Sequence, residues 1–149
     1  MSLLTLTKIA NSLEIAPGYF FEKKDNKSKS SNLNNKSTNL HIVNKGNNKV
    51  MSPSNGITYF LLTPNLDCKV QFLYALFEPH TKTAEKAYKH IGEEYAYILK
   101  GKMQIEISGK RYKIEEGDSI VFDPNKLHRL INPYNEKAEA ICVNSPPWF

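Results

Sequence analysis

The sequence predicts an all-β fold built from short antiparallel strands. Two observations support this prediction: apolar and polar residues alternate along most of the chain beyond residue 40, and turn-forming residues recur about every 8–12 positions. This spacing is typical of a sandwich or a small barrel, and the same region shows almost no helical periodicity. The 149 residues suit one domain with a short appendage.

Residues 1–22 form that appendage, and their apolar residues follow the period of a helix. The apolar side chains at positions 3, 6, 9, 10 and 13 recur at steps of three and four, which places them on one helical face. Pro17-Gly18 ends the pattern, and a short aromatic run follows. Because so short a segment cannot close a core alone, we expect it to pack against another surface.

Residues 23–39 are interpreted as a polar linker. Leu33 is the one apolar residue in this stretch, so it cannot bury enough surface to offset the entropy lost on ordering. The net charge of +5 also has its origin here, since residues 23–50 hold seven lysines and one acid. Residues 51–149 hold equal numbers of basic and acidic side chains, so the charge does not indicate nucleic-acid binding by the main domain.

Beyond the linker, the alternation and the turns between segments define the expected strands. They cover residues 40–43, 57–62, 70–77, 94–99, 103–107, 111–114, 119–122, 127–131 and 138–143. The run over 70–77 is continuously apolar, so we expect that strand to be covered on both faces. Ser108-Gly109-Lys110 predicts a tight hairpin turn.

Cysteine spacing and the lack of targeting patterns favour the cytoplasm. Cys68 and Cys142 lie 74 positions apart, so they form no CxxC pair, and we expect two reduced thiols. No run approaches the roughly 18 apolar residues of a membrane span, and the N-terminus lacks the features of a signal peptide. We therefore expect a cytoplasmic protein without a membrane partner.

Three polar side chains, His90, Glu94 and His128, form a candidate site. On a strand, the even offset between His90 and Glu94 places both on one face, where Gly92 and Ala96 leave space for a cavity. If the strand carrying His128 lies opposite, two imidazoles and one carboxylate converge. Such a set can hold Fe, Mn, Zn or Ni and leave coordination positions open for a substrate or ligand.

Two segments resemble the two sequence motifs of the cupin superfamily. HIGEEYAYILKG, residues 90–101, resembles the first motif, and GDSIVFDPNKLHRLIN, residues 117–132, resembles the second. The resemblance covers residues 57–149. It implies a cupin double-stranded β-helix, that is, a jelly-roll barrel, over residues 40–149, with a cavity at one mouth.

The resemblance also implies metal ligation by His90, Glu94 and His128, but the ligand set is incomplete. The family's first motif usually supplies one more histidine, and Tyr88 stands at that position here. A phenol is a poor neutral ligand because its pKa is about 10. We therefore expect one divalent transition metal on three ligands, or no metal at all; without metal, Tyr88, His90, Glu94, His128 and Asn132 would orient a small ligand.

A second resemblance concerns the N-terminal segment. LLTLTKIANSLEIAPGYFFE, residues 3–22, resembles the last two helices of the helix-turn-helix domain of Cro/repressor-like regulators. The order of helices, polar linker and cupin is similar to that of the helix-turn-helix–cupin transcriptional regulators. In that family the helix that reads DNA precedes the segment present here, so residues 1–22 correspond to a truncated domain. We expect no sequence-specific DNA binding by this chain alone.

These resemblances imply one function and leave a second open. The first is a small-molecule-sensing cupin domain of a bacterial transcriptional regulator, whose DNA contacts depend on the missing part of the helical domain. We expect this protein to be a homodimer, because exposed sheet edges favour pairing. The alternative is a metal-dependent cupin enzyme of the isomerase or dioxygenase type that uses His90, Glu94 and His128.

Overall fold

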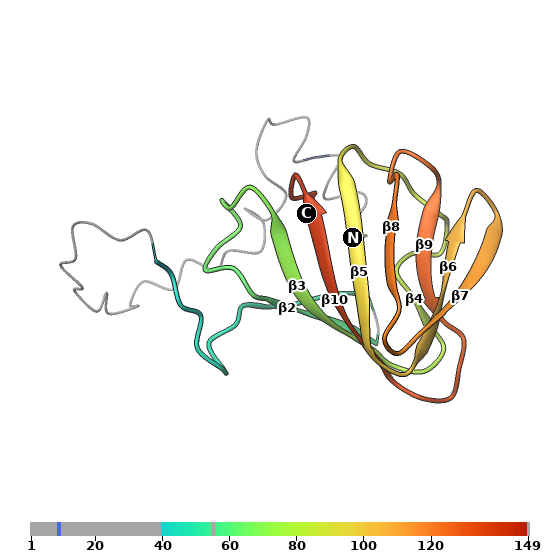
Figure 1. Ribbon diagram of the computed structural model, residues 1–149, viewed down its shortest axis with the longest axis horizontal. Coiled ribbons are helices and arrows are strands. Elements are labelled where there is room, and N and C mark those ends of the chain that lie inside the picture. Colours follow the sequence, from blue (N-terminus) through green and yellow to red (C-terminus); the bar gives the residue numbers. More distant parts are fainter. Residues whose placement is uncertain (1–8, 10–39, 55, 149) are drawn as a thin grey trace.

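The computed structural model describes Ile9, residues 40–54 and residues 56–148. Apart from Ile9, the predicted helical segment 1–22 and the linker 23–39 lie outside the described residues, so both assignments stay predictions. Within the described ranges the fold is all-β, as the alternation predicted (Figure 1). No helix in this part of the chain is long and apolar enough to cross a membrane.

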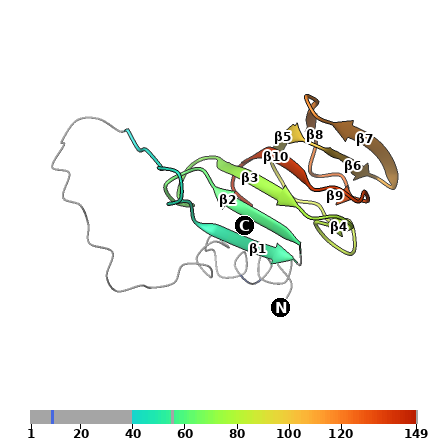
Figure 2. The ribbon, with the colours of Figure 1, turned by 90° about the horizontal axis from the view of Figure 1, so that it is seen from below.

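The described residues form ten strands in two antiparallel sheets. They are β1 (Val50–Ser54), β2 (Ile57–Leu61), β3 (Gln71–Phe77), β4 (Thr81–Lys82), β5 (Glu93–Lys100), β6 (Lys102–Ile107), β7 (Lys110–Glu115), β8 (Ser119–Phe122), β9 (His128–Asn132) and β10 (Ala138–Ser145). One sheet has the order β1-β2-β3-β10-β5-β8, and the other has the order β4-β9-β6-β7. Figure 2 shows the two sheets from below.

The hydrophobic core lies between the sheets because each strand turns alternate residues inward. In β5 and β10 the burial alternates residue by residue, and β10 lies between β3 and β5. Buried Leu73, Phe77 and Ile98 come from the six-stranded sheet, and buried Met103 and Ile105 come from the four-stranded sheet. This is the two-layer arrangement of a jelly roll, in which a core and an interior site share one space.

The hairpin predicted around Gly109 is confirmed. Ser108 and Gly109 both have positive φ, of 50° and 80°, and they connect β6 to β7 in a two-residue turn. Positive φ at both central positions is the backbone that matches the twist of a tight hairpin. Glycine adopts it without a steric penalty, which is why the local sequence was sufficient to locate this turn.

The strand predicted over residues 40–43 is wrong. This stretch has no strand pairing, and the side chains of Leu40 and Ile42 are 70% and 71% exposed. The first strand is instead β1, which starts at Val50 and pairs with β2. Alternation alone does not make a strand, since the backbone also needs a neighbour to complete its hydrogen bonds.

The expectation for residues 70–77 also needs correction. β3 covers most of this run, but its burial alternates: Leu73, Ala75 and Phe77 are fully buried, while Phe72 is 38% exposed. One side of β3 faces the core, and the other lies on the outer face of the six-stranded sheet. A continuous apolar run therefore marks two apolar faces here, of which only the inner one is fully covered.

Candidate metal centre

His128 enters the core from the first position of β9. Its side chain is 1% exposed, and its backbone N–H and carbonyl form a bridge with Tyr88. The ring Nδ1 lies 2.8 Å from the carbonyl oxygen of Lys126. A carbonyl only accepts hydrogen bonds, so Nδ1 donates, and Nε2 is the ring nitrogen that faces Glu94 in the interior.

His90 and Glu94 come together by a different route from the one that the sequence predicted. β5 begins at Glu93, so His90 precedes the strand rather than sharing its face. Gly92, with φ of 112°, turns the chain between them and returns the His90 ring to the Glu94 carboxylate. The two residues meet as expected, but a loop rather than strand alternation brings them together.

The three side chains converge within a small volume. The Nε2 of His90 lies 3.1 Å from a Glu94 carboxylate oxygen, and the Nε2 of His128 lies 3.4 Å from the same oxygen. One potential ligand atom from each residue lies within 4.8 Å of the others. The His90 Nδ1 lies 3.1 Å from the Ile91 carbonyl oxygen, so Nε2 is the ring nitrogen that faces Glu94, as it is in His128.

This arrangement has the chemistry of a metal site. The His128 Nε2 is buried and has no hydrogen-bond partner among the described residues. A buried polar atom without a partner is costly, and here two ring nitrogens and one carboxylate oxygen lie within 4.8 Å of one another. A cation on these three ligands satisfies all of them, and backbone carbonyls already fix both rings from behind.

The electrostatics of Glu94 reflect the same neighbours. Burial raises the pKa of this carboxyl, but hydrogen bonds from the imidazoles of His128 and His90 outweigh burial, and the net pKa is lowered. Glu94 is therefore a carboxylate near neutral pH. Two imidazole nitrogens and one carboxylate oxygen are a donor set that suits divalent transition metals, which bind imidazole through the deprotonated nitrogen.

Tyr88 lines the site but does not complete the ligand set. Its ring centre lies 4.8 Å from that of His128. Burial, and then the charge of Glu94, raise the pKa of the Tyr88 hydroxyl far above its ordinary value. The phenol is neutral and interacts with the Thr83 hydroxyl. Tyr88 stands where the motif that this segment resembles usually has a histidine, so three candidate ligands remain.

Trp148 covers the site from the C-terminal side. Its ring stacks on His90 with centroids 4.6 Å apart and planes 5° apart, and on Tyr88 at 5.0 Å. Gly92 makes this possible, because a Cβ at that position would lie 2.2 Å from the carbonyl oxygen of Ser145. The C-terminal segment thus crosses directly against the loop that carries His90.

The expected cavity is present but almost filled. A space of about 10 Å³ lies beside Glu94, which is about the smallest cavity that can hold one water molecule. Its lining is mainly aromatic and apolar, and comprises Tyr59, Leu73, Thr83, Tyr88, Glu94, Leu130, Cys142, Asn144 and Trp148. Gly92 and Ala96 therefore do not leave the room that the sequence predicted, because the tyrosines and Trp148 occupy it.

Asn132 does not line this space. Its amide nitrogen donates to the carbonyls of Phe77, Glu78 and Glu136, and its side-chain oxygen accepts from the backbone N–H of Tyr134. Asn132 ends β9, four residues after His128, which is roughly 13 Å along a strand. Because both ends of the amide are engaged, Asn132 holds a loop and is not placed to orient a ligand.

Asn144 is the site residue that the sequence did not reveal. It lies directly opposite Glu94 in the pairing of β10 with β5, and its side-chain oxygen is buried without a hydrogen-bond partner among the described residues. Its nitrogen donates to Gln71 at 3.1 Å. The sequence could not reveal Asn144 because its position beside Glu94 depends on the pairing of β10 with β5, two strands that lie far apart in the chain.

Comparison with known proteins supports the cupin fold. Residues 73–144 match the model of the Cupin domain family. An uncharacterized protein of Methanocaldococcus jannaschii is 29% identical over 91 residues, which cover 59% of this chain and 71% of that protein.

Solved structures agree at the level of the fold. An RmlC-like cupin from Shewanella frigidimarina has a TM-score of 0.60 at 17% identity, covering 72% of this chain and 91% of its own. The Cupin_2 domain of an XRE family transcriptional regulator from Enterobacter cloacae has a TM-score of 0.54 at 14% identity, covering 62% and 99%. A predicted oxalate decarboxylase from Thermotoga maritima has a TM-score of 0.56 at 24% identity, covering 66% and 91%.

These likenesses extend to regulators and enzymes alike, so they establish the fold and not the activity. The family match, the two-sheet sandwich and the three converging ligands all lie in the same part of the chain. Residues 73–144, just under half of the chain, match the Cupin domain family, and the fold is similar to that of solved cupins.

Proposed function

We propose that this chain binds one divalent transition metal through His90, Glu94 and His128, and that it binds a small ligand there as the sensing domain of a transcriptional regulator. The observation that carries the proposal is the buried Nε2 of His128, which faces the Glu94 carboxylate and lacks a hydrogen-bond partner among the described residues. A bound cation would remove that cost.

Three protein ligands leave coordination positions open, which is what a ligand-binding metal requires. When bound, the metal would supply Lewis acidity toward an oxygen of the ligand. A metal would take the place of the proton on each Nε2, while each Nδ1 keeps a backbone carbonyl as its hydrogen-bond partner and so holds the ring in place. Fe, Mn, Zn and Ni all fit this donor set, and the choice among them is a matter for experiment.

Trp148 forms one wall of the site and belongs to the C-terminal segment. The space beside Glu94 holds about 10 Å³, so a ligand larger than a water molecule has to displace a wall of the site. Trp148 is the wall that stacks on His90 and belongs to the C-terminal segment. A ligand that moves this segment would convert binding into a change of surface, which is what a sensor needs.

The assignment to a regulator is supported by two features. Residues 1–22 resemble the end of a helix-turn-helix domain, and the fold is similar to the cupin domain of an XRE family regulator. On this proposal the protein acts in the cytoplasm, which agrees with its two free thiols, Cys68 and Cys142. In that family, DNA contacts come from the recognition helix of the helix-turn-helix domain.

An enzyme is the second candidate. A site with two histidines, one carboxylate and open positions also suits oxygenases and isomerases, and the fold is similar to a predicted oxalate decarboxylase. The two candidates make different use of the same metal. A sensor would bind its ligand and release it unchanged, whereas an enzyme would convert it.

The first experiment is elemental analysis of the full chain, purified without chelator and reported as metal per chain. We expect about one transition metal per chain, and a value near zero after soaking in Fe(II), Mn(II), Zn(II) and Ni(II) contradicts the proposal. The His128→Ala variant should lose the metal and keep its fold, as measured by circular dichroism. Turnover by the metal-loaded wild type in oxygenase or isomerase assays would replace the sensor with the enzyme.

A further inference from the structure

A row of polar side chains crosses the largely apolar inner face of the six-stranded sheet. Gln71, Asn144 and Glu94 lie on the neighbouring strands β3, β10 and β5, and each pairs directly with the next. All three residues are buried. Because a buried polar group is costly unless it is hydrogen-bonded, each polar atom of this row needs a partner.

The amide of Asn144 is held at its nitrogen, whereas its oxygen is buried and unpaired among the described residues. The Nδ2 donates a hydrogen bond to the Oε1 of Gln71 at 3.1 Å, and the Oδ1 has no partner in this part of the chain. The nitrogen and the oxygen of an amide diverge from one carbon, so a nitrogen directed at β3 turns the oxygen away from that strand. Asn144 also lines the space beside Glu94. The fold therefore keeps an oriented acceptor beside the candidate metal centre.

The other polar groups around this space indicate which chemistry would complete it. The Thr83 hydroxyl accepts a hydrogen bond from the backbone N–H of Leu130 at 3.1 Å and interacts with the Tyr88 hydroxyl. Glu94 and Asn144 both present oxygen atoms, and no lysine or arginine is among the described residues that line the space. The group that complements two acceptors is a hydrogen-bond donor.

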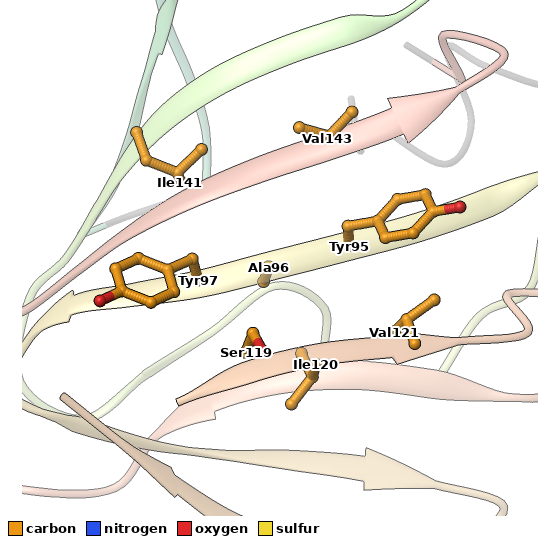
Figure 3. Close-up of a pocket in the computed structure, with 8 residues that line it drawn as sticks. All are labelled: Tyr95, Ala96, Tyr97, Ser119, Ile120, Val121, Ile141 and Val143. Carbon is orange, nitrogen blue, oxygen red and sulfur yellow. The ribbon is translucent and has the colours of Figure 1, made fainter. Parts of the chain in front are cut away.

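The opposite face of the same strands has a larger hollow but no such acceptor. Figure 3 shows Tyr95 and Val143, which adjoin Glu94 and Asn144 in the sequence and point to the outer side of the sheet. A groove of about 330 Å³ lies among the outer side chains. Among the described residues, none that lines this groove has a buried side-chain oxygen without a partner. The unpaired acceptor therefore distinguishes the inner site, although the outer groove is larger.

We propose that the Asn144 Oδ1 accepts a hydrogen bond from a small ligand of the metal centre, so that the ligand carries an N–H or O–H group on the atom next to its metal-binding oxygen. Hydroxy acids and hydroxamates are molecules of this class. The inference rests on the proposed metal site, to which Glu94 contributes the carboxylate. Since directly paired residues have Cβ atoms roughly 5 Å apart, one small molecule can contact both Glu94 and Asn144. A ligand that lacks the donor leaves the Asn144 oxygen buried and unpaired, which lowers its affinity.

The test compares two probes that differ at the donor. Acetohydroxamate and N-methylacetohydroxamate bind metal through the same two oxygens, but only the first has an N–H group. Calorimetry on the Zn(II)-loaded full chain gives the ratio of their dissociation constants. We expect this ratio to favour acetohydroxamate in the wild type, and to fall about tenfold in Asn144→Leu. Because the size of the added methyl group acts in both proteins, the change in the ratio isolates the hydrogen bond.

Gln104→Leu is the matched control. Gln104 also has a buried side-chain oxygen without a partner among the described residues, but it lies on β6 and does not line the space beside Glu94. This variant should keep the ratio of the wild type. Circular dichroism and zinc per chain are measured for each protein. A wild type that binds no metal contradicts the proposed function, and the inference with it. Zinc binding with the same ratio in wild type and Asn144→Leu overturns the inference alone.

A second measurement on the wild type covers the case in which Asn144→Leu does not fold. In ¹³C-labelled, Zn(II)-loaded protein, the side-chain carbonyl resonance of Asn144 should move downfield with acetohydroxamate and stay in place with N-methylacetohydroxamate, because the carbonyl accepts a hydrogen bond only from the first. Equal shifts with the two probes, or no shift with either, would rule out this role for Asn144.

Discussion

Two carboxylates in this domain are each flanked by two basic side chains, and they differ in what those side chains can do. Glu94 lies between His90 and His128 inside the sandwich. Glu106 lies between Arg111 and Arg129, and one of its oxygens is 3.0 Å from a nitrogen of each arginine. We call these sets the imidazole cluster and the guanidinium cluster.

Neighbouring residues of one strand contribute to both clusters. His128 and Arg129 are consecutive on β9, so their side chains point to opposite faces of the four-stranded sheet. Glu106 pairs directly with Arg129 on one side and with Arg111 on the other, so the guanidinium cluster is a row across three strands. A step of one residue therefore separates a candidate metal ligand from a structural ion pair.

The difference lies in the lone pairs. A guanidinium stays protonated and has no acceptor atom, so it neutralises Glu106 permanently and offers nothing to a metal. An imidazole can be neutral, and then its free nitrogen is a ligand. The guanidinium cluster on the outer face is therefore a permanent ion pair, whereas the imidazole cluster on the inner face is a candidate metal site.

Replacing each carboxylate in turn gives the largest expected contrast. Glu94→Gln should weaken metal binding by at least about 100-fold, because an amide is a poor ligand and adds a donor among the lone pairs. Glu106→Gln should leave metal affinity unchanged. Titration of Zn(II) or Ni(II), followed by calorimetry and by the fluorescence of Trp148, the chain's single tryptophan, measures both variants. Equal losses in the two variants would refute the distinction.

Gly92→Ala tests how the C-terminal segment, with Trp148, packs over the imidazole cluster. The added Cβ would collide with the Ser145 carbonyl at a positive φ, so the C-terminal segment must shift, at a cost of about 2 kcal/mol. The emission of Trp148 should move to longer wavelength as its ring leaves His90. Gly109→Ala has a similar φ and nothing within 4 Å, so it reports backbone strain alone. An unchanged Trp148 emission in Gly92→Ala would contradict the packing described here.

Glu106→Gln should cost about 1 kcal/mol at neutral pH, and the cost should depend on pH. Hydrogen bonds from Arg129, and then from Arg111, hold the pKa of Glu106 below its ordinary value of 4.5 despite burial. The stabilisation is therefore present above pH 4.5 and is lost as the pH falls through the lower pKa of the folded protein. Urea unfolding of wild type and variant from pH 7 down to pH 3 should show the gap closing. A gap that stays constant over this range would exclude the ion pairs as its source.

The smallest expected effect is a gain of binding. Arg111→His together with Arg129→His would place two imidazoles beside Glu106 in adjacent cross-strand positions. We expect a second equivalent of Zn(II) or Ni(II), bound more weakly than the first because the position is closer to solvent. Arg111→Lys/Arg129→Lys is the matched control and should bind only the first equivalent. If both variants bind only one equivalent, the presence of imidazole lone pairs is not sufficient to explain why one cluster would bind metal and the other does not.

The alternation and the turns determined most of the strands from the sequence alone. β6 and β7 form a local hairpin through Ser108-Gly109, and Gly117-Asp118 turns the chain from β7 to β8 in the other sheet, so both turns are encoded within a few residues. The strand predicted over residues 40–43 failed for the opposite reason, since a strand depends on a neighbour that may come from anywhere in the chain. β4, only two residues long, exists solely because β9 lies beside it.

The candidate ligands were likewise visible in the sequence, because His90, Glu94 and His128 lie in two recognisable motifs. What surrounds them was not. Asn144 reaches the site only through the pairing of β10 with β5, Asn132 is removed from it by its hydrogen bonds to a loop, and Trp148 closes it by stacking on His90. Residue type and local period are properties of the chain, whereas the volume of a cavity and the partners of a buried atom depend on contacts between distant segments, which only the folded sandwich brings together.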